Sequence, residues 1–124
     1  MITKARAVNI YVGDQQRALD FYVDALGFEL RSDQPNGPDM RWIEVAPPGA
    51  DTVLVLMTPP GLEDRVGTWS NVIFDCDDID VTFAELHNKG VEFSQPPAVQ
   101  PWGMKMALFK DIDGNEFVLV QTQG

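Results

Sequence analysis

The sequence predicts an α+β fold made of two βαβββ modules, and three observations support this prediction. The chain of 124 residues contains a weak internal repeat, in which residues 7–30 resemble residues 71–93. Each copy starts with alternating apolar and polar residues, as in a half-buried strand, and continues with helical spacing. Each copy is then followed by two apolar runs separated by a turn, which is typical of a β-hairpin.

The length and composition favour one folded domain. Apolar residues make up 44% of the chain and charged residues 23%, which is ordinary for a globular protein. A chain of this size can bury a modest core. We therefore expect a single domain of residues 1–124, with modules of residues 1–60 and 69–124 joined by a linker of residues 61–68.

The first element of each copy is predicted to be a strand with one apolar face. The apolar sets that we expect to pack under a helix are Val8, Ile10 and Val12 in the first copy, and Val72, Phe74 and Cys76 in the second. The opposite faces mix polar and aromatic groups, as expected for the wall of a cleft. They carry Ala7, Asn9 and Tyr11, and Asn71, Ile73 and Asp75.

A short helix is predicted to follow each of these strands. Asp14 and Asp78 stand where a helix N-cap is expected, and Gly27 and Gly90 stand where a C-cap is expected. A further strand begins near Phe28 in the first copy and near residue 91 in the second. The stretches "RSDQPNGPD" and "SQPPAVQPWG" after these starts are predicted to be loops, because they are rich in Pro, Gly, Asn and Gln.

A hairpin is predicted to close each module. Residues 40–60 contain a Pro-Pro-Gly turn, and residues 103–122 contain an Asp-Gly turn near Asp113 and Gly114. The repeat aligns Val55 with Val118. It places Leu54, Leu56, Phe117 and Leu119 on the helix side, and Val53, Val55, Met57, Glu116, Val118 and Val120 on the side of the cleft.

Charge and cysteine content exclude several classes of function. The chain has 19 acidic and 9 basic residues and a formal charge of −10, which opposes binding to nucleic acid or to anionic membranes. No apolar run is long enough to span a bilayer, and the first residues do not resemble a signal peptide. Cys76 is the one cysteine and is expected to be a buried strand thiol. We expect a cytoplasmic protein.

Three motifs resemble the vicinal oxygen chelate superfamily, which includes glyoxalases, bleomycin-resistance proteins, fosfomycin-resistance enzymes and extradiol dioxygenases. They are "VNIYVGDQQRALDFYVDALGFEL", "FDCDDIDVTFAELHNKGVEF" and "FKDIDGNEFVLVQ", in which Ile112 replaces the usual proline. The resemblance covers essentially the whole chain. It implies a glyoxalase-like fold, in which two βαβββ modules curve into a half-open barrel around a ligand cleft, and it implies a homodimer.

The same resemblance implies where a metal would bind. Metal-dependent members hold one ligand on each of four strands, and motif register places these positions at Ala7, Val55, Asn71 and Val118. Three of these residues have no donor atom, and His87, the one histidine, belongs to a predicted helix. Transition metals require several His, Cys or carboxylate donors. We therefore predict no metal and no cofactor, although a shift of one residue in register would offer Glu44 or Glu116.

Aromatic and polar residues of the predicted cleft are the candidates for binding a small molecule. Large rings beside apolar walls suit a planar ligand, and packing at a dimer interface is the alternative for each tryptophan. The predicted ligand-binding residues are Asn9, Tyr11, Trp42, Val55, Trp69, Asn71, Trp102 and Val118.

Three carboxylates are the candidates for acid–base catalysis: Glu44, Asp75 and Glu116. A carboxylate between apolar walls can act as an acid or a base, whereas a hydrogen bond to a neighbouring strand is the structural alternative. Lys105 and Arg41 could bind an anionic group of the ligand, and pairing with nearby acids is the alternative.

Two functions from different classes follow. The first is a metal-independent binding protein that sequesters a drug or a metabolite, as the resemblance to the resistance proteins implies. The second is a metal-independent or atypical-metal lyase, isomerase or dioxygenase-like enzyme acting on a small carbonyl or aromatic compound. Aromatic walls without a convincing catalytic pair favour binding, and the question of enzyme activity stays open.

Overall fold

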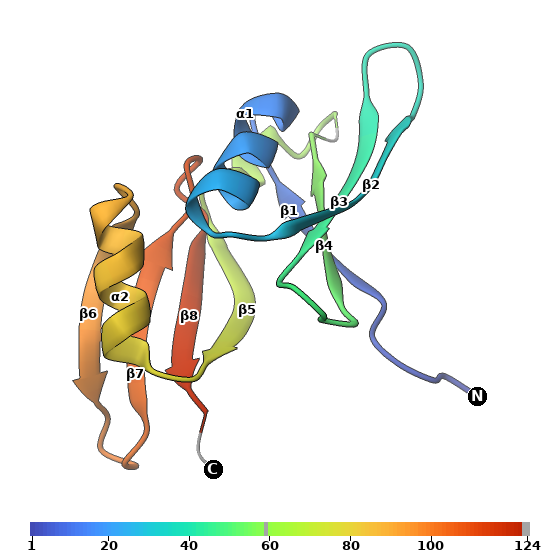
Figure 1. Cartoon of the computed structure of the whole chain (residues 1–124). Coiled ribbons are helices and arrows are strands. Elements are labelled where there is room, and N and C mark those ends of the chain that lie inside the picture. The colour runs from blue at the N-terminus through green and yellow to red at the C-terminus, as the bar shows by residue number, and fades with distance from the viewer. Residues whose placement is uncertain (59, 123–124) are drawn as a thin grey trace. The chain divides into compact units, whose positions relative to one another are not determined.

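The computed structural model describes residues 1–58 and 60–122. The chain divides into two compact units, Met1–Gly67 and Thr68–Gly124, each of which contains a four-stranded mixed sheet and a helix (Figure 1). The predicted α+β fold of paired βαβββ modules is confirmed. Residues 61–67 of the predicted linker group with the first unit, and the single domain of residues 1–124 stays a prediction.

The first unit has a short helix and four strands. Its elements are β1 (Ala7–Tyr11), α1 (Gln15–Asp20), the π-helical turn η1 (Phe21–Ala25), β2 (Glu29–Pro35), β3 (Arg41–Ala46), β4 (Val53–Met57) and the 3₁₀ turn η2 (Glu63–Arg65). The strand order is β1-β4-β3-β2. β1 and β4 are parallel, whereas the other neighbours are antiparallel.

The second unit repeats this topology. Its elements are β5 (Trp69–Cys76), α2 (Ile79–Asn88), β6 (Glu92–Val99), β7 (Lys105–Lys110) and β8 (Glu116–Gln121). The strand order is β5-β8-β7-β6, and the parallel pair is again the first strand with the last. The internal repeat of the sequence therefore corresponds to a repeated unit of structure.

Both predicted helix N-caps are present. A side-chain oxygen of Asp14 accepts the backbone N–H of Arg17 at 3.0 Å, and Asp78 accepts the N–H groups of Asp80 and Val81. Gly90, with φ of 88°, follows the end of α2, where only a residue without a β-carbon adopts this backbone freely.

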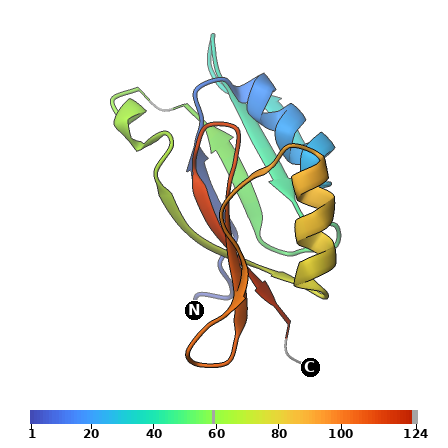
Figure 2. The same cartoon turned by 90° about the vertical axis from the view of Figure 1, so that its left-hand side faces the viewer.

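α1 covers one face of the first sheet (Figure 2). The core between them consists of buried apolar side chains from α1, from the turn η1, and from β1, β3, β4 and the residue after β1: Ile10, Val12, Ala18, Leu19, Tyr22, Ile43, Val45, Leu54 and Leu56. Gln15 ties the helix to the strands. Its side-chain amide donates to the carbonyl oxygens of Arg41 (2.6 Å) and Leu56 (2.8 Å) and accepts the N–H of Arg41 (3.1 Å).

α2 covers one face of the second sheet (Figure 2). The core of this unit is aromatic. The ring of Phe117 lies 5.3 Å from that of Phe74 and 5.4 Å from that of Phe109, measured between centroids. The rings of Phe83 in α2 and Phe93 in β6 pack edge to face, with their centroids 4.7 Å apart. Leu119 and Phe117 thus face the helix, as the repeat predicted, and so do Leu54 and Leu56 in the first unit.

The two stretches predicted to be loops are partly strand, and this is a correction. β2 runs to Pro35, and β6 runs through Pro96 and Pro97 to Val99. Both strands lie at the edge of their sheet, where one side of the backbone needs no partner, so proline can be accommodated. Among the helices of the described residues, none is long and apolar enough to cross a membrane.

Candidate functional site

Each sheet has a face opposite its helix, which we call its open face. Across the open face of the first sheet, four neighbouring strands place Asn9, Val55, Glu44 and Ser32 side by side, and we call these residues the first row. Ile73, Val118, Leu108 and Gln95 occupy the same places in the second sheet and form the second row. Val55 and Val118 thus have equivalent positions, as the repeat predicted.

The two rows differ in polarity. In the first row, Val55 is 1% exposed and lies between the amide of Asn9 and the carboxylate of Glu44. In the second row, Val118 is 4% exposed and lies between Ile73 and Leu108. The first open face can therefore form hydrogen bonds with a ligand, whereas the centre of the second offers only apolar contact.

Trp42 and Glu44 form a pair on the first open face. They are two residues apart on β3, so their side chains point to the same side of the sheet. The indole N–H of Trp42 donates to Oε2 of Glu44 at 2.9 Å, and the Trp42 side chain is 37% exposed. Tyr11 lies next to Met57 on the same face and is half-buried. Five predicted candidates are thus on one face: Asn9, Tyr11, Trp42, Glu44 and Val55.

Trp69 and Asn71 lie at the start of β5, where the strand bulges. Trp69 pairs with Glu116 and Ile73 pairs with Val118, so four steps along β5 match two along β8. Asn71, within the bulge, has φ of 64°, in the left-handed region. The Ser70 hydroxyl donates to the carbonyl oxygen of Glu116 (2.7 Å) and accepts the N–H of Val72 (3.1 Å), which holds the bulge in place.

The other candidates of the second unit are more dispersed. Asp75 pairs with Val120 near the end of β5, and Glu116 pairs with Lys110 at the start of β8. Trp69 is 48% exposed beside Glu116. Trp102 is 67% exposed and lies in the turn between β6 and β7, outside the second row. The structure therefore brings Trp69 and Glu116 together and leaves Trp102 apart from them.

The residue types at the four inferred metal positions do not fit a transition metal. Val55 and Val118 have hydrocarbon side chains, Ala7 has a methyl group, and Asn71 is held in a bulge. Within residues 1–58 and 60–122, no three His, Cys, Asp or Glu side chains are grouped so that they could hold a metal ion. Such a site needs several of these donors converging on one point.

Cys76 is a half-buried thiol of β5, which donates weakly to the carbonyl oxygen of Val120 at 3.5 Å. Burial raises the pKa of the Cys76 thiol, and the nearby carboxylates of Asp75, Asp77 and Asp78 raise this pKa further, although a hydrogen bond with Thr82 opposes them. The reactive form of cysteine is the thiolate. This environment keeps the group protonated and does not favour a nucleophile.

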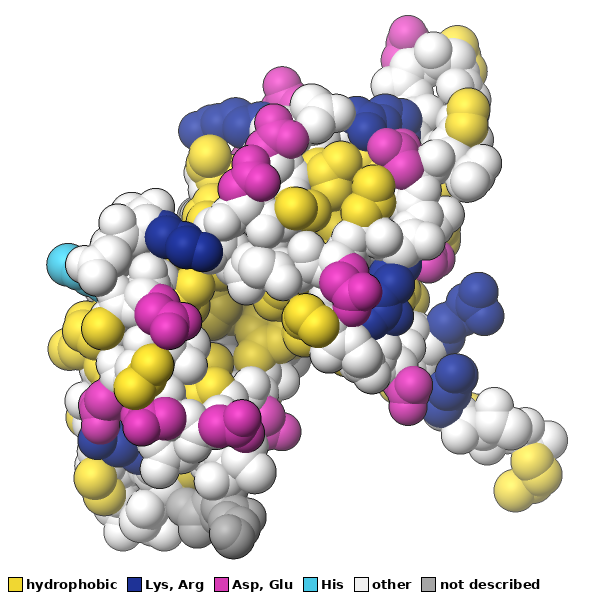
Figure 3. Space-filling view, viewed as in Figure 1, with side chains coloured by type: hydrophobic (Ala, Val, Ile, Leu, Met, Phe, Trp, Pro, Cys, Tyr) yellow, Lys and Arg dark blue, Asp and Glu magenta, His cyan; other side chains and the backbone are white. Residues whose placement is uncertain are grey.

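The cationic side chains singled out from the sequence pair with acids. Arg41 donates to both carboxylate oxygens of Asp33, and Lys105 pairs with Asp80. These pairs confirm the structural alternative for both residues. Acidic side chains are spread over both units on the side shown in Figure 3.

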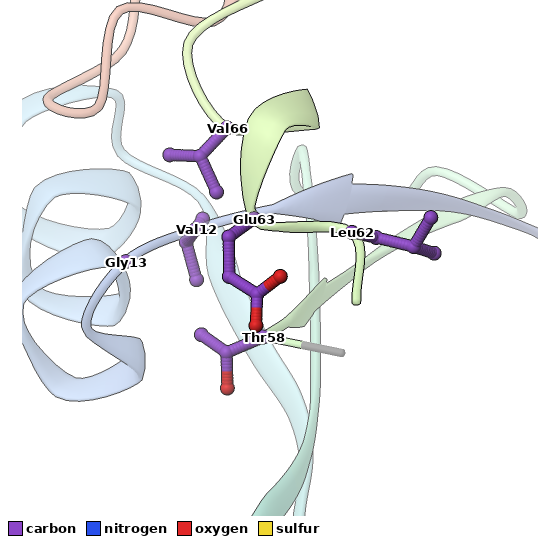
Figure 4. Close-up of a pocket in the computed structure, with 6 residues that line it drawn as sticks. All are labelled: Val12, Gly13, Thr58, Leu62, Glu63 and Val66. Carbon is purple, nitrogen blue, oxygen red and sulfur yellow. The ribbon is translucent and has the colours of Figure 1, made fainter. Parts of the chain in front are cut away.

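Sequence reasoning missed two hollows, one in each unit. The first has a volume of about 300 Å³ and is lined by Val12, Gly13, Thr58, Leu62, Glu63 and Val66, with the Glu63 carboxylate directed toward Thr58 (Figure 4). Backbone N–H groups of Glu63 and Gly61 hold the pKa of the Glu63 carboxyl below its usual range. The residues lining this hollow come from separate loops with no periodic pattern, so no sequence signal pointed to it.

The second hollow, of about 320 Å³, lies on the helix side of the second sheet. It is lined by Phe83, His87, Val91, Glu92, Phe93 and Pro96. The imidazole of His87 lies 5.5 Å from the ring of Phe83, measured between centroids, and His87 is exposed. This residue belongs to a helix, as the sequence predicted. Neither hollow includes a residue of the two rows.

Comparison with known proteins identifies the family. Residues 4–119 match the model of the Glyoxalase/Bleomycin resistance protein/Dioxygenase superfamily. The chain belongs to this superfamily. A relative in Bacillus subtilis (strain 168), the uncharacterized protein YetH, is 39% identical over 119 residues, which cover 96% of this chain and 98% of YetH.

Solved structures of the glyoxalase/bleomycin resistance superfamily are also similar to this chain. A member from Sphaerobacter thermophilus DSM 20745 is 41% identical, with a TM-score of 0.90 and 98% of each chain covered. TnmS3, an antibiotic binding protein from Streptomyces sp. CB03234, is 38% identical, with a TM-score of 0.87 and again 98% of each chain covered. An antibiotic-binding protein therefore resembles this chain over nearly its whole length.

Proposed function

We propose that this member of the superfamily is a metal-independent binding protein for planar, largely apolar small molecules, such as an antibiotic or a metabolite. The observation that carries the proposal is the composition of the two rows. Each has a valine at its centre, and each open face also carries a partly exposed tryptophan, Trp42 in one unit and Trp69 in the other. Apolar walls with large rings and few polar groups are typical of sites that bind aromatic ligands.

The similarity to TnmS3 supports the same proposal, because that protein binds an antibiotic and resembles this chain over 98% of its length. The alternative function, a metal-independent lyase or isomerase, would use one of the carboxylates on the open faces, Glu44, Asp75 or Glu116. An experiment can distinguish the two functions: an enzyme would convert the bound compound into a product, whereas a binding protein would leave it unchanged.

The experiment is a binding screen on protein stripped of metal. Purified chain is dialysed against a chelator and then titrated with polycyclic aromatic compounds, and quenching of tryptophan fluorescence reports binding. We expect saturable binding that is the same with and without added Ni, Zn, Mn or Fe, and no chemical change in the ligand. Elemental analysis that finds one tightly held metal per chain, or binding that requires added metal, would contradict the proposal.

Single substitutions assign the binding residues. Trp42→Phe and Trp69→Phe are expected to weaken binding by about tenfold, since a smaller ring without the indole N–H replaces each tryptophan. Trp102→Phe tests the third predicted tryptophan separately, because Trp102 lies in the turn between β6 and β7. If neither Trp42→Phe nor Trp69→Phe weakens binding, the open faces are not the site.

A further inference from the structure

We propose that Trp42 and Glu44 form a receptor for a positively charged group on the ligand, so that the protein prefers cationic planar compounds to neutral ones. This inference rests on the proposed binding function and adds the chemical class of the ligand. It uses residues of the first unit alone. The pair consists of an aromatic ring beside a carboxylate, which is a combination that attracts organic cations by charge and by the ring quadrupole.

The geometry of the pair leaves the carboxylate available. Oε2 of Glu44 accepts the indole N–H of Trp42 at 2.9 Å, which holds the carboxylate beside the ring. Among the described residues, no lysine, arginine or histidine forms an ion pair with Glu44. Nearby cations have other partners: Arg41 pairs with Asp33, and Arg31 donates to backbone carbonyls and contacts Glu29.

The carboxylate of Glu44 is half-buried beside the hydrocarbon of Val55, so its attraction for a positive group is screened less than in open water. The indole of Trp42 donates a hydrogen bond to this carboxylate, and no cation of the described residues pairs with it. The formal charge of the whole chain, −10, also favours the approach of cations and disfavours anions. A cationic ligand would satisfy both the carboxylate and the exposed ring.

The internal repeat provides a comparison within the same molecule. Leu108 pairs with Val118 in the second sheet as Glu44 pairs with Val55 in the first, and Met106 stands two residues before Leu108 as Trp42 stands before Glu44. The equivalent positions of the second unit thus have neither a carboxylate nor an indole. A hydrogen-bonded pair of carboxylate and indole beside the central valine is therefore a feature of the first open face, whereas the centre of the second supplies apolar contact.

The test uses two dyes that differ by one methyl group and one charge. Acridine is neutral at pH 7.5, whereas 10-methylacridinium is a permanent cation of nearly the same shape. Quinoline and 1-methylquinolinium are a smaller matched pair. Calorimetric titration of the purified wild-type chain is expected to show the cation of a pair binding about tenfold more tightly than the neutral compound.

Two variants show whether Glu44 causes this preference. Glu44→Gln keeps an oxygen that can accept the indole N–H but removes the charge, so the ratio of the two affinities is expected to fall several-fold, to the part that the ring of Trp42 supplies. Glu85→Gln removes one charge from an exposed position on α2 and is expected to leave the ratio unchanged.

The outcomes separate this inference from the proposed function. If the neutral and cationic dyes bind equally well, or if Glu44→Gln leaves the preference intact, the inference is overturned while aromatic binding stands. If neither dye of either pair binds, nor any compound of the aromatic screen, the proposed function fails and the inference fails with it.

Discussion

At the scale of single residues, Asn71 shows how one side chain can have two explanations. The sequence suggested it as a ligand-binding residue because it stands at a position where related proteins hold a metal. In the structure, Asn71 has φ of 64°, and no other described residue apart from glycine has positive φ. Asparagine adopts this backbone more readily than most residues, so the backbone of the bulge is sufficient reason for its presence.

We predict that Asn71→Val destabilises the protein by about 1–2 kcal/mol, because a β-branched residue is strained in the left-handed region. Asn71→Gly is expected to be neutral or slightly stabilising, since glycine accepts this backbone without strain. The measurement is the free energy of unfolding in urea.

Asn9→Val is the matched control, because Asn9 is exposed on β1 and does not have positive φ. Its effect is expected to stay within about 0.5 kcal/mol. If Asn71→Gly destabilised the protein as much as Asn71→Val, the amide group rather than the backbone would be the reason for asparagine at this position.

Trp42 and Glu44 are two residues that share one explanation. The sequence suggested each residue separately, Trp42 for ligand binding and Glu44 for catalysis. The alternation of β3 places both on one face, and their hydrogen bond joins them into a single feature. The role of the carboxylate is thereby changed from a candidate acid or base to a candidate partner for a cation.

At the scale of elements, one side chain of α1 adds hydrogen bonds to the apolar packing that holds the helix on the sheet. Gln15, the first residue of the helix, uses both ends of its amide to bond the backbones of β3 and β4. These bonds satisfy carbonyl groups at the edge of the core, where water has limited access. Since β3 carries Trp42 and Glu44, this contact also supports the candidate site.

We predict that Gln15→Ala lowers the free energy of unfolding by about 2 kcal/mol, because three hydrogen bonds at a partly buried site lose their partner. Gln16→Ala is the matched control. Gln16 is exposed on the same helix and bonds the side chains of Asp20 and Arg41, so its loss is expected to cost less than about 0.5 kcal/mol. Equal effects of the two substitutions would show that the bridge to the strands is not what stabilises α1.

The edge strands were the elements that the sequence did not reveal. The composition of residues 31–39 and 94–103 favours loops, yet β2 and β6 extend into both. The reason is that a strand at the edge of a sheet has a neighbour on one side, so the backbone groups on its other side need no partner strand. Local composition does not state which strand is at the edge, because the order of strands depends on pairing between distant segments.

At the scale of the whole molecule, the exposed apolar residues of the second open face bear on assembly. Trp69 is 48% exposed and Ile73 is 65% exposed in the chain alone. Exposed apolar groups that lie together on a face usually mark a surface that binds a partner or a ligand. The predicted homodimer would provide one way to cover them.

We predict that the purified chain sediments with twice the mass of a monomer. Ile73→Glu is expected to weaken self-association, since a charge would replace an exposed apolar group of this face. Val81→Glu is a matched control, because Val81 is 51% exposed on α2 and lies on the other side of the sheet. A monomeric chain at all concentrations would contradict the prediction of a homodimer.

The sequence alone determined the repeat, the type of nearly every element, the two helix N-caps and the helix-facing residues of the strands. These features depend on short-range rules, namely alternation along a strand and the preference of aspartate and glycine for helix ends. It also determined that three of the four residues at the inferred metal positions lack donor atoms, because that follows from identity and motif register.

Only the tertiary structure decided which candidates are neighbours. Asn9, Val55 and Glu44 come from three separate strands, and their alignment in one row depends on the register of a parallel and an antiparallel pair. At the bulge around Asn71, four residue steps along β5 match two along β8, and no local pattern in the sequence predicts this shift in register. Register is set by long-range hydrogen bonds and packing, whereas sequence patterns report only which side of its own strand each residue occupies.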